Sequence, residues 1–232
     1  MTPKIHTFEN DVALVEALAV RIAAILSRAV EARGQASLAV SGGRTPVNLY
    51  RRLSAMKLPW HDVIVSLVDE RWVDEDHPDS NAALVKRTLL QGPAAGATFV
   101  CMKNADSDPA NAQLEVSERL KEQILPLDVV ILGMGDDGHT ASLFPGAQGT
   151  TEAMSVSEPL LCRGIHIPGA DYARMTLTVP ALIEAGHRFL YITGQTKRAV
   201  LENALQPGSP AQLPVRAVLQ APVDTEIYYA AG

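Results

Sequence analysis

The chain has 232 residues, of which 47% are hydrophobic and 20% charged, and its formal net charge at pH 7 is −6. This much apolar material can form a large core, which excludes a mainly disordered chain. A net acidic chain also argues against non-specific nucleic-acid binding and against membrane attachment through a polybasic surface.

The N-terminal segment and the cysteines indicate a protein of the reducing cytoplasm. Residues 1–11 contain no apolar core of a secretory signal, and the apolar stretch 12–30 is interrupted by charged residues, so no membrane span is expected. The two cysteines, Cys101 and Cys162, have neither zinc-site spacing nor a disulfide pattern, and we expect free thiols.

The N-terminal half alternates between amphipathic helices and apolar strands. Apolar residues at three- and four-residue steps from Val15 to Ala29 predict a long helix ending near Gly34. The apolar run 36–40 is typical of a buried strand, after which Thr45 and Pro46 predict the N-cap and first residue of a helix. Further elements are predicted, in chain order, as strand 63–68, helix 80–90, strand 97–101 and a helix that begins at 108–109.

The alternation continues to the C-terminus. The predicted elements are strand 128–132, strand 174–179, a short helix from 180, strand 189–193, helix 195–205 and strand 226–230. Strands that alternate with helices indicate an α/β fold with a mainly parallel sheet covered on both faces. We expect one domain over residues 1–232, with 206–214 as a surface loop.

Four segments of special composition directly follow predicted strands. They are 41–46 (SGGRTP), 69–71 (DER), 133–139 (GMGDDGH) and 194–198 (GQTKR). The carboxyl ends of parallel strands meet at one edge of the sheet, where ligands bind. We therefore expect these segments to form a single site.

Two of these segments are suited to an anion. Gly42 and Gly43 allow backbone N–H groups to approach an anion at a helix N-terminus, although Gly-Gly is also an ordinary turn. Lys197 and Arg198 lie in the first turn of a predicted helix, where a cation opposes the helix dipole. They indicate a bound anion, unless they are simply solvated side chains.

The third segment matches G-x-G-x-x-G, but we do not expect a nicotinamide cofactor. Asp136 and Asp137 would repel a pyrophosphate, and Pro145 follows too soon for an uninterrupted helix. His139, with Asp137 and Asp69 nearby, is instead a candidate general base, although a lone histidine is more often structural.

The histidines and cysteines do not form a zinc-binding pattern, and no metal is expected. The residues favour acid–base chemistry on a small phosphorylated molecule without a cofactor.

Several motifs together resemble 6-phosphogluconolactonases. They are SGGRTP (41–46), DERWV (69–73), SNAALVKRTLL (80–90), LGMGDDGHTASLFPG (132–146), RMTLT (174–178) and TGQTKRAVLENAL (193–205). The resemblance implies hydrolysis of 6-phosphoglucono-1,5-lactone to 6-phosphogluconate in the oxidative pentose phosphate pathway. It also implies a Rossmann-like α/β fold and no metal. We expect a monomer or small homo-oligomer.

The resemblance also assigns roles to particular residues. Arg174 and Lys197 match phosphate-binding cations of the family, and Asp69 and Asp137 match acidic positions of the wider superfamily. The cations are joined by the phosphate-binding loop, which consists of Ser41, Gly42, Gly43, Arg44 and Thr45.

The implied mechanism is hydrolysis by an activated water. Neutral His139 would take a proton from the water that attacks C1 and return it to the departing ring oxygen. Arg71 or backbone N–H groups are candidates for stabilising the oxyanion. Asp137 or Asp69 would orient the ring or bind sugar hydroxyls.

Two alternatives remain at this point. Glucosamine-6-phosphate deaminase/isomerases of the same superfamily carry a glutamate five residues after the histidine, where this chain has Phe144. A non-catalytic sugar-phosphate sensor is the other alternative, but neither end of the chain carries a basic helix-turn-helix segment.

Overall fold

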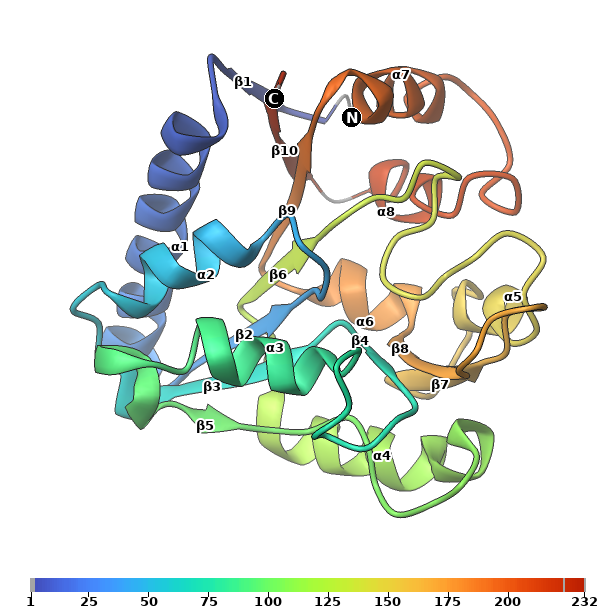
Figure 1. The fold of residues 1–232 in the computed structure, drawn as a ribbon, viewed down its shortest axis with the longest axis horizontal. Coiled ribbons are helices and arrows are strands. Elements are labelled where there is room, and N and C mark those ends of the chain that lie inside the picture. Colours follow the sequence, from blue (N-terminus) through green and yellow to red (C-terminus); the bar gives the residue numbers. More distant parts are fainter. Residues whose placement is uncertain (1–2, 223, 232) are drawn as a thin grey trace.

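The computed structural model describes residues 3–222 and 224–231, which form two sheets surrounded by helices (Figure 1). The strands are β1 (Ile5–Phe8), β2 (Ala36–Val40), β3 (Val63–Leu67), β4 (Asp69–Arg71), β5 (Thr98–Phe99), β6 (Val129–Leu132), β7 (Cys162–Ile165), β8 (Arg174–Leu177), β9 (His187–Thr193) and β10 (Thr225–Ala230). The α-helices are α1 (Asp11–Arg33), α2 (Val47–Ser54), α3 (Asn81–Thr88), α4 (Pro109–Ile124), α5 (Thr150–Ala153), α6 (Val179–Glu184), α7 (Gln195–Ala204) and α8 (Arg216–Leu219). Two short 3₁₀ turns are η1 (Trp60–Asp62) and η2 (Gly92–Gly96).

The larger sheet has seven strands in the order β1-β10-β9-β6-β2-β3-β5, and every neighbouring pair is parallel. All residues of β2, β3 and β6 are buried, as expected for parallel strands covered on both faces. This confirms the predicted α/β class and mainly parallel sheet.

The long first helix has the termini that its sequence indicates. The Asn10 side chain accepts a hydrogen bond from the Ala13 N–H at 2.9 Å. At the other end Gly34 has a left-handed backbone (φ 76°), and its N–H donates to the Val30 carbonyl at 2.7 Å. The buried stripe of α1, which includes Leu18 and Ile22, packs along the strands of the main sheet.

The predicted start of the second helix is wrong by one residue. Pro46 is the N-cap rather than the first helical residue, and α2 begins at Val47 with no side-chain cap. The cause is a turn in which the Val47 N–H donates to the Arg44 carbonyl at 3.3 Å, so the chain is still turning at Thr45.

The predicted strand at 174–179 ends at Leu177 and does not join the parallel sheet. As β8 it forms a separate antiparallel sheet with β4 and β7, in the order β4-β8-β7. Sequence analysis missed β1, β4 and β7, whose three or four residues are too few for a clear periodicity. This small sheet matters for function because it forms one wall of the cavity described below.

No helix among residues 3–222 and 224–231 combines the length and apolar character needed to cross a membrane.

Candidate active site

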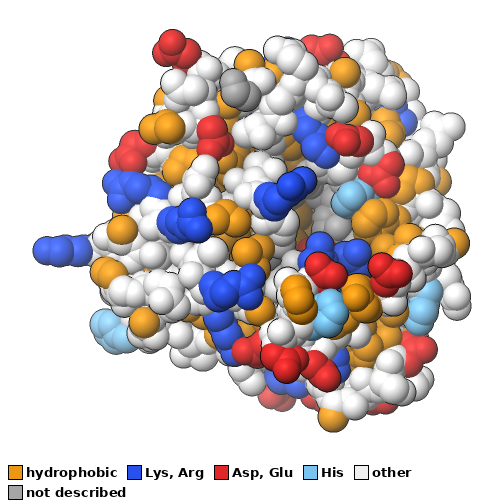
Figure 2. Space-filling model, in the orientation of Figure 1, with side chains coloured by type: hydrophobic (Ala, Val, Ile, Leu, Met, Phe, Trp, Pro, Cys, Tyr) orange, Lys and Arg blue, Asp and Glu red, His pale blue; other side chains and the backbone are white. Residues whose placement is uncertain are grey.

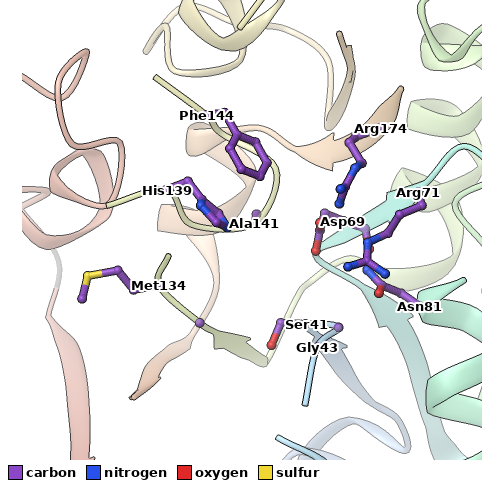
Figure 3. Close-up of a pocket in the computed structure, with 12 residues that line it drawn as sticks. Ser41, Gly43, Asp69, Arg71, Asn81, Met134, His139, Ala141, Phe144 and Arg174 are labelled. Atoms are coloured by element: carbon purple, nitrogen blue, oxygen red, sulfur yellow. The ribbon is translucent and has the colours of Figure 1, made fainter. Parts of the chain in front are cut away.

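The four segments singled out in the sequence follow β2, β3, β6 and β9, which are adjacent parallel strands, and therefore they leave the sheet at one edge. A cavity of about 170 Å³ opens there. Three of the four segments contribute to its wall, together with β8 and the chain that follows the third segment (Figure 3). The lining residues are Ser41, Gly42, Gly43, Asp69, Arg71, Asn81, Gly133, Met134, His139, Ala141, Phe144 and Arg174.

His139 is held by the carboxylate of Asp137. The Nδ1 atom of His139 lies 2.6 Å from Asp137 Oδ1, and the same oxygen accepts the His139 backbone N–H at 3.1 Å. An ionised carboxylate can only accept, so Nδ1 is the donor of this hydrogen bond, and in the neutral imidazole the free lone pair is on Nε2. Burial opposes ionisation of Asp137, but the hydrogen bonds and charge of His139 outweigh it and hold the pKa of Asp137 below its ordinary value.

The loop that carries His139 is fixed at several points. The Gly135 N–H donates to the His139 carbonyl at 2.8 Å, and Val215 N–H donates to the Gly138 carbonyl at 2.9 Å. A Cβ at position 135 would lie 2.1 Å from His139 Nδ1, so only glycine leaves room for the imidazole. These constraints orient the ring before any substrate arrives.

Two arginines lie side by side on adjacent strands of the small sheet. Arg71 of β4 and Arg174 of β8 are antiparallel register partners, and both line the cavity. Neither makes an ion pair with a carboxylate among the described residues, and the Nε atom of each is buried without a hydrogen-bond partner. Burial, and then the charge of Arg71, hold the pKa of Arg174 below its ordinary value. Like charges directly opposite on antiparallel strands are destabilising, so this arrangement favours a bound anion.

Glu70 fixes the backbone at Arg71 and at the start of α3. It is buried and accepts the backbone N–H groups of Arg71 (2.7 Å), Asn81 (2.7 Å) and Ala82 (2.8 Å). Burial raises the pKa of the Glu70 carboxyl against these donors, which lower it. The carboxylate thereby fastens the start of α3 to β4.

Asp69 is held on both its side chain and its backbone. Its Oδ2 accepts the Ser142 hydroxyl at 2.6 Å, and its backbone carbonyl accepts the Asn81 amide at 2.8 Å. Asp69 lines the same cavity as His139, as predicted. The Ser142 hydroxyl therefore holds one oxygen of a carboxylate that lies at the cavity wall.

Some predicted binding residues lie outside this cavity. The Lys197 ammonium lies 2.9 Å from Asp136 Oδ1 and does not line the main cavity. Arg44 and Thr45 line a smaller adjacent cavity of about 80 Å³, on whose wall Gly42 and Gly43 also lie. The assignment of Lys197, Arg44 and Thr45 to substrate binding stays a prediction.

Sequence reasoning assigned no role to Asn81, Met134 or Ala141, which also line the cavity. Asn81 directly follows the N-cap Ser80 of α3, and its position beside Asp69 depends on the buried Glu70 rather than on any local pattern. Ala141 has a left-handed backbone (φ 49°), which is unusual for a residue other than glycine and is not visible in the sequence.

The surface around the cavity has mixed charge. Figure 2 shows Lys and Arg side chains around a hollow on this face, with acidic side chains and histidine at its rim. Within residues 3–222 and 224–231, no cluster of three or more His, Cys, Asp or Glu side chains is arranged to hold a metal ion.

The family model for glucosamine-6-phosphate isomerases/6-phosphogluconolactonase matches residues 9–228 of this chain. The chain belongs to this family. Among curated relatives, a 6-phosphogluconolactonase of Rhizobium meliloti is 44% identical over 99% of this chain and 100% of its own length. One from Pseudomonas aeruginosa is also 44% identical, over 91% of this chain and 89% of its own length.

Solved structures agree with the family assignment. A 6-phosphogluconolactonase from Shewanella baltica superposes with a TM-score of 0.95 at 37% sequence identity. That match covers 99% of this chain and 98% of the other. The α/β architecture of the family member is therefore the architecture described above.

Proposed function

We propose that this chain hydrolyses 6-phospho-D-glucono-1,5-lactone to 6-phospho-D-gluconate, the second step of the oxidative pentose phosphate pathway, with His139 as the general base. The observation that carries the proposal is that one cavity contains both a carboxylate-bound imidazole and an opposed pair of arginines. Relatives named 6-phosphogluconolactonase that are 36–44% identical over nearly the whole chain support this reaction.

The phosphate is the group that the arginines suit best. A phosphate dianion beside Arg174 and Arg71 would relieve their repulsion and give the buried Nε atoms acceptors. Gly43, with a left-handed backbone (φ 90°), exposes the backbone of the glycine loop on the same cavity. Lys197 would bind the phosphate only after its ion pair with Asp136 breaks.

The acid–base steps then follow from the Asp137–His139 pair. Nε2 of His139 takes a proton from a water as its oxygen bonds to C1, and Asp137 stabilises the imidazolium that forms. The tetrahedral oxyanion reforms the carbonyl, the bond between C1 and the ring oxygen breaks, and the imidazolium returns the proton to that oxygen. The acid product ionises and releases one proton to solvent.

Proton release tests this proposal directly. Freshly prepared 6-phosphogluconolactone is added to the protein in weakly buffered solution, and the spontaneous rate is subtracted. We expect acid release well above that rate, and none beyond it would refute the proposal. Binding without turnover would instead indicate a sugar-phosphate sensor, and ammonia from glucosamine 6-phosphate would indicate a deaminase.

The proposed setting of this reaction is cytoplasmic, in a single domain that acts as a monomer or small homo-oligomer. These three statements stay predictions.

A further inference from the structure

The Phe144 ring contacts both the base and one of the opposed arginines. It stacks on the His139 imidazole with a centroid separation of 4.0 Å and an interplanar angle of 25°. The Arg174 guanidinium carbon lies 5.9 Å from the centroid of the same ring. Figure 3 shows Phe144 at the cavity wall between these two side chains.

The fold brings Phe144 to this position through a tight turn. The Leu143 N–H donates to the Thr140 carbonyl at 3.0 Å, and Ala141 within the turn has the left-handed backbone noted above. The turn reverses the chain just after His139, so that the side chain five residues later returns onto the imidazole. A left-handed backbone at a residue other than glycine persists only where the surrounding structure requires it.

The contact has electrostatic consequences for the base. An aromatic face attracts cations, and the imidazole becomes a cation when it takes the proton of water. Arg174 places a permanent positive charge near the same ring, with Asp69 on the cavity wall and Arg71 directly opposite. The negative charges of Asp69, Glu70 and Asp79 also act on Arg174. While no phosphate is bound, the positive charge that these carboxylates leave uncompensated disfavours a second cation on His139.

We propose that Phe144 is a positioning residue that couples phosphate binding at Arg174 to the base His139, so that the phosphate raises kcat as well as lowering KM. The dianion neutralises Arg174, and the imidazolium then forms on the stacked ring with less repulsion. This inference rests on the proposed function, because it assumes that the phosphate of the substrate binds at Arg174.

The test separates the phosphate from the lactone. Wild-type protein hydrolyses unphosphorylated glucono-1,5-lactone with and without added inorganic phosphite dianion, with enzyme-free rates subtracted at each phosphite concentration. We expect saturating phosphite to accelerate the enzymatic rate by about 2- to 30-fold, the range that corresponds to a cation–aromatic interaction. No acceleration, although calorimetry shows phosphite bound, would overturn the coupling.

Phe144→Leu tests whether the ring carries the effect. This variant keeps an apolar side chain but loses the aromatic face, and we expect it to bind phosphite with unchanged affinity while losing the acceleration. On the phosphorylated lactone its kcat should fall by about 2- to 30-fold with KM nearly unchanged. Phe144→Tyr retains the face and should restore both the acceleration and kcat.

Phe99→Leu is the matched control. Phe99 is also half-buried beside a cation, with the Lys86 ammonium 5.2 Å from its ring centroid, but it lies on the edge strand β5 away from the cavity. The Phe99→Leu protein should keep the acceleration by phosphite. Persistence of the acceleration in Phe144→Leu would refute the role of the ring, whereas failure of wild-type protein to hydrolyse the phosphorylated lactone would refute the proposed function itself.

Discussion

Replacing Asp137 by asparagine removes the charge that stabilises protonated His139 while leaving the size of the side chain unchanged. The carboxylate does not line the cavity and contacts the imidazole only on its Nδ1 side, at 2.6 Å. The substitution should therefore lower kcat for the phosphorylated lactone and leave KM nearly unchanged.

The size of the effect follows from the exposure of the pair. Unit charges about 4 Å apart interact by about 1 kcal/mol in water and about 4 kcal/mol near a protein surface. The side chains of Asp137 and His139 are 49% and 29% exposed, so solvent screens part of this interaction. A loss of about 1.5–3 kcal/mol predicts a 10- to 150-fold lower kcat.

Proton release from the lactone, corrected for spontaneous hydrolysis, measures this change. Asp62→Asn is a matched control, because Asp62 Oδ2 lies 2.9 Å from the Nε2 of the exposed His61, away from the cavity. It should retain wild-type kcat. An Asp137→Asn protein whose kcat stays within about threefold of wild type would show that Asp137 does not stabilise the imidazolium.

His139→Ala should lower kcat by about 10²–10⁴ without weakening binding of 6-phosphogluconate in calorimetry, and near-native turnover would remove His139 from the mechanism. Arg174→Ala should raise KM for the phosphorylated lactone by about 10- to 150-fold, because a charge-assisted contact is lost. Lys197→Ala should do so less, since Asp136 already pairs with Lys197. Equal losses of both variants on unphosphorylated gluconolactone would contradict these roles. Glu70→Gln can keep an oxygen for the Arg71 and Asn81 N–H groups but sets an amide nitrogen against the Ala82 N–H, and it should lower the free energy of unfolding in urea by about 1–3 kcal/mol; an unchanged transition midpoint would contradict this. Phe144→Glu should destabilise the protein by several kcal/mol and release no ammonia from glucosamine 6-phosphate, and ammonia release would show that this position does not separate the two chemistries.

The strongest sequence predictions concern the main sheet and the place of the site. The apolar runs that became β2, β3 and β6 are buried along their whole length, and this pattern is readable because parallel strands lose water on both faces. The phosphate-binding loop and the loop that carries His139 line one cavity. This was predictable because both follow parallel strands, whose carboxyl ends meet at one edge of the sheet. The helix start at Val47 was missed because a turn and a first helical turn have nearly the same sequence signals.

The amino-acid sequence by itself determined the α/β class, the edge of the sheet at which the site lies and the Asp137–His139 pair, because strand burial and loop contacts between near neighbours are local properties. Only the tertiary structure decided that Arg71 and Arg174 are cross-strand neighbours, since they lie on short strands far apart in the chain. It also decided that Lys197 pairs with Asp136 and that Phe144 stacks on His139. Such contacts depend on how distant segments pack together and on which close approaches the backbone allows, and no local periodicity records them.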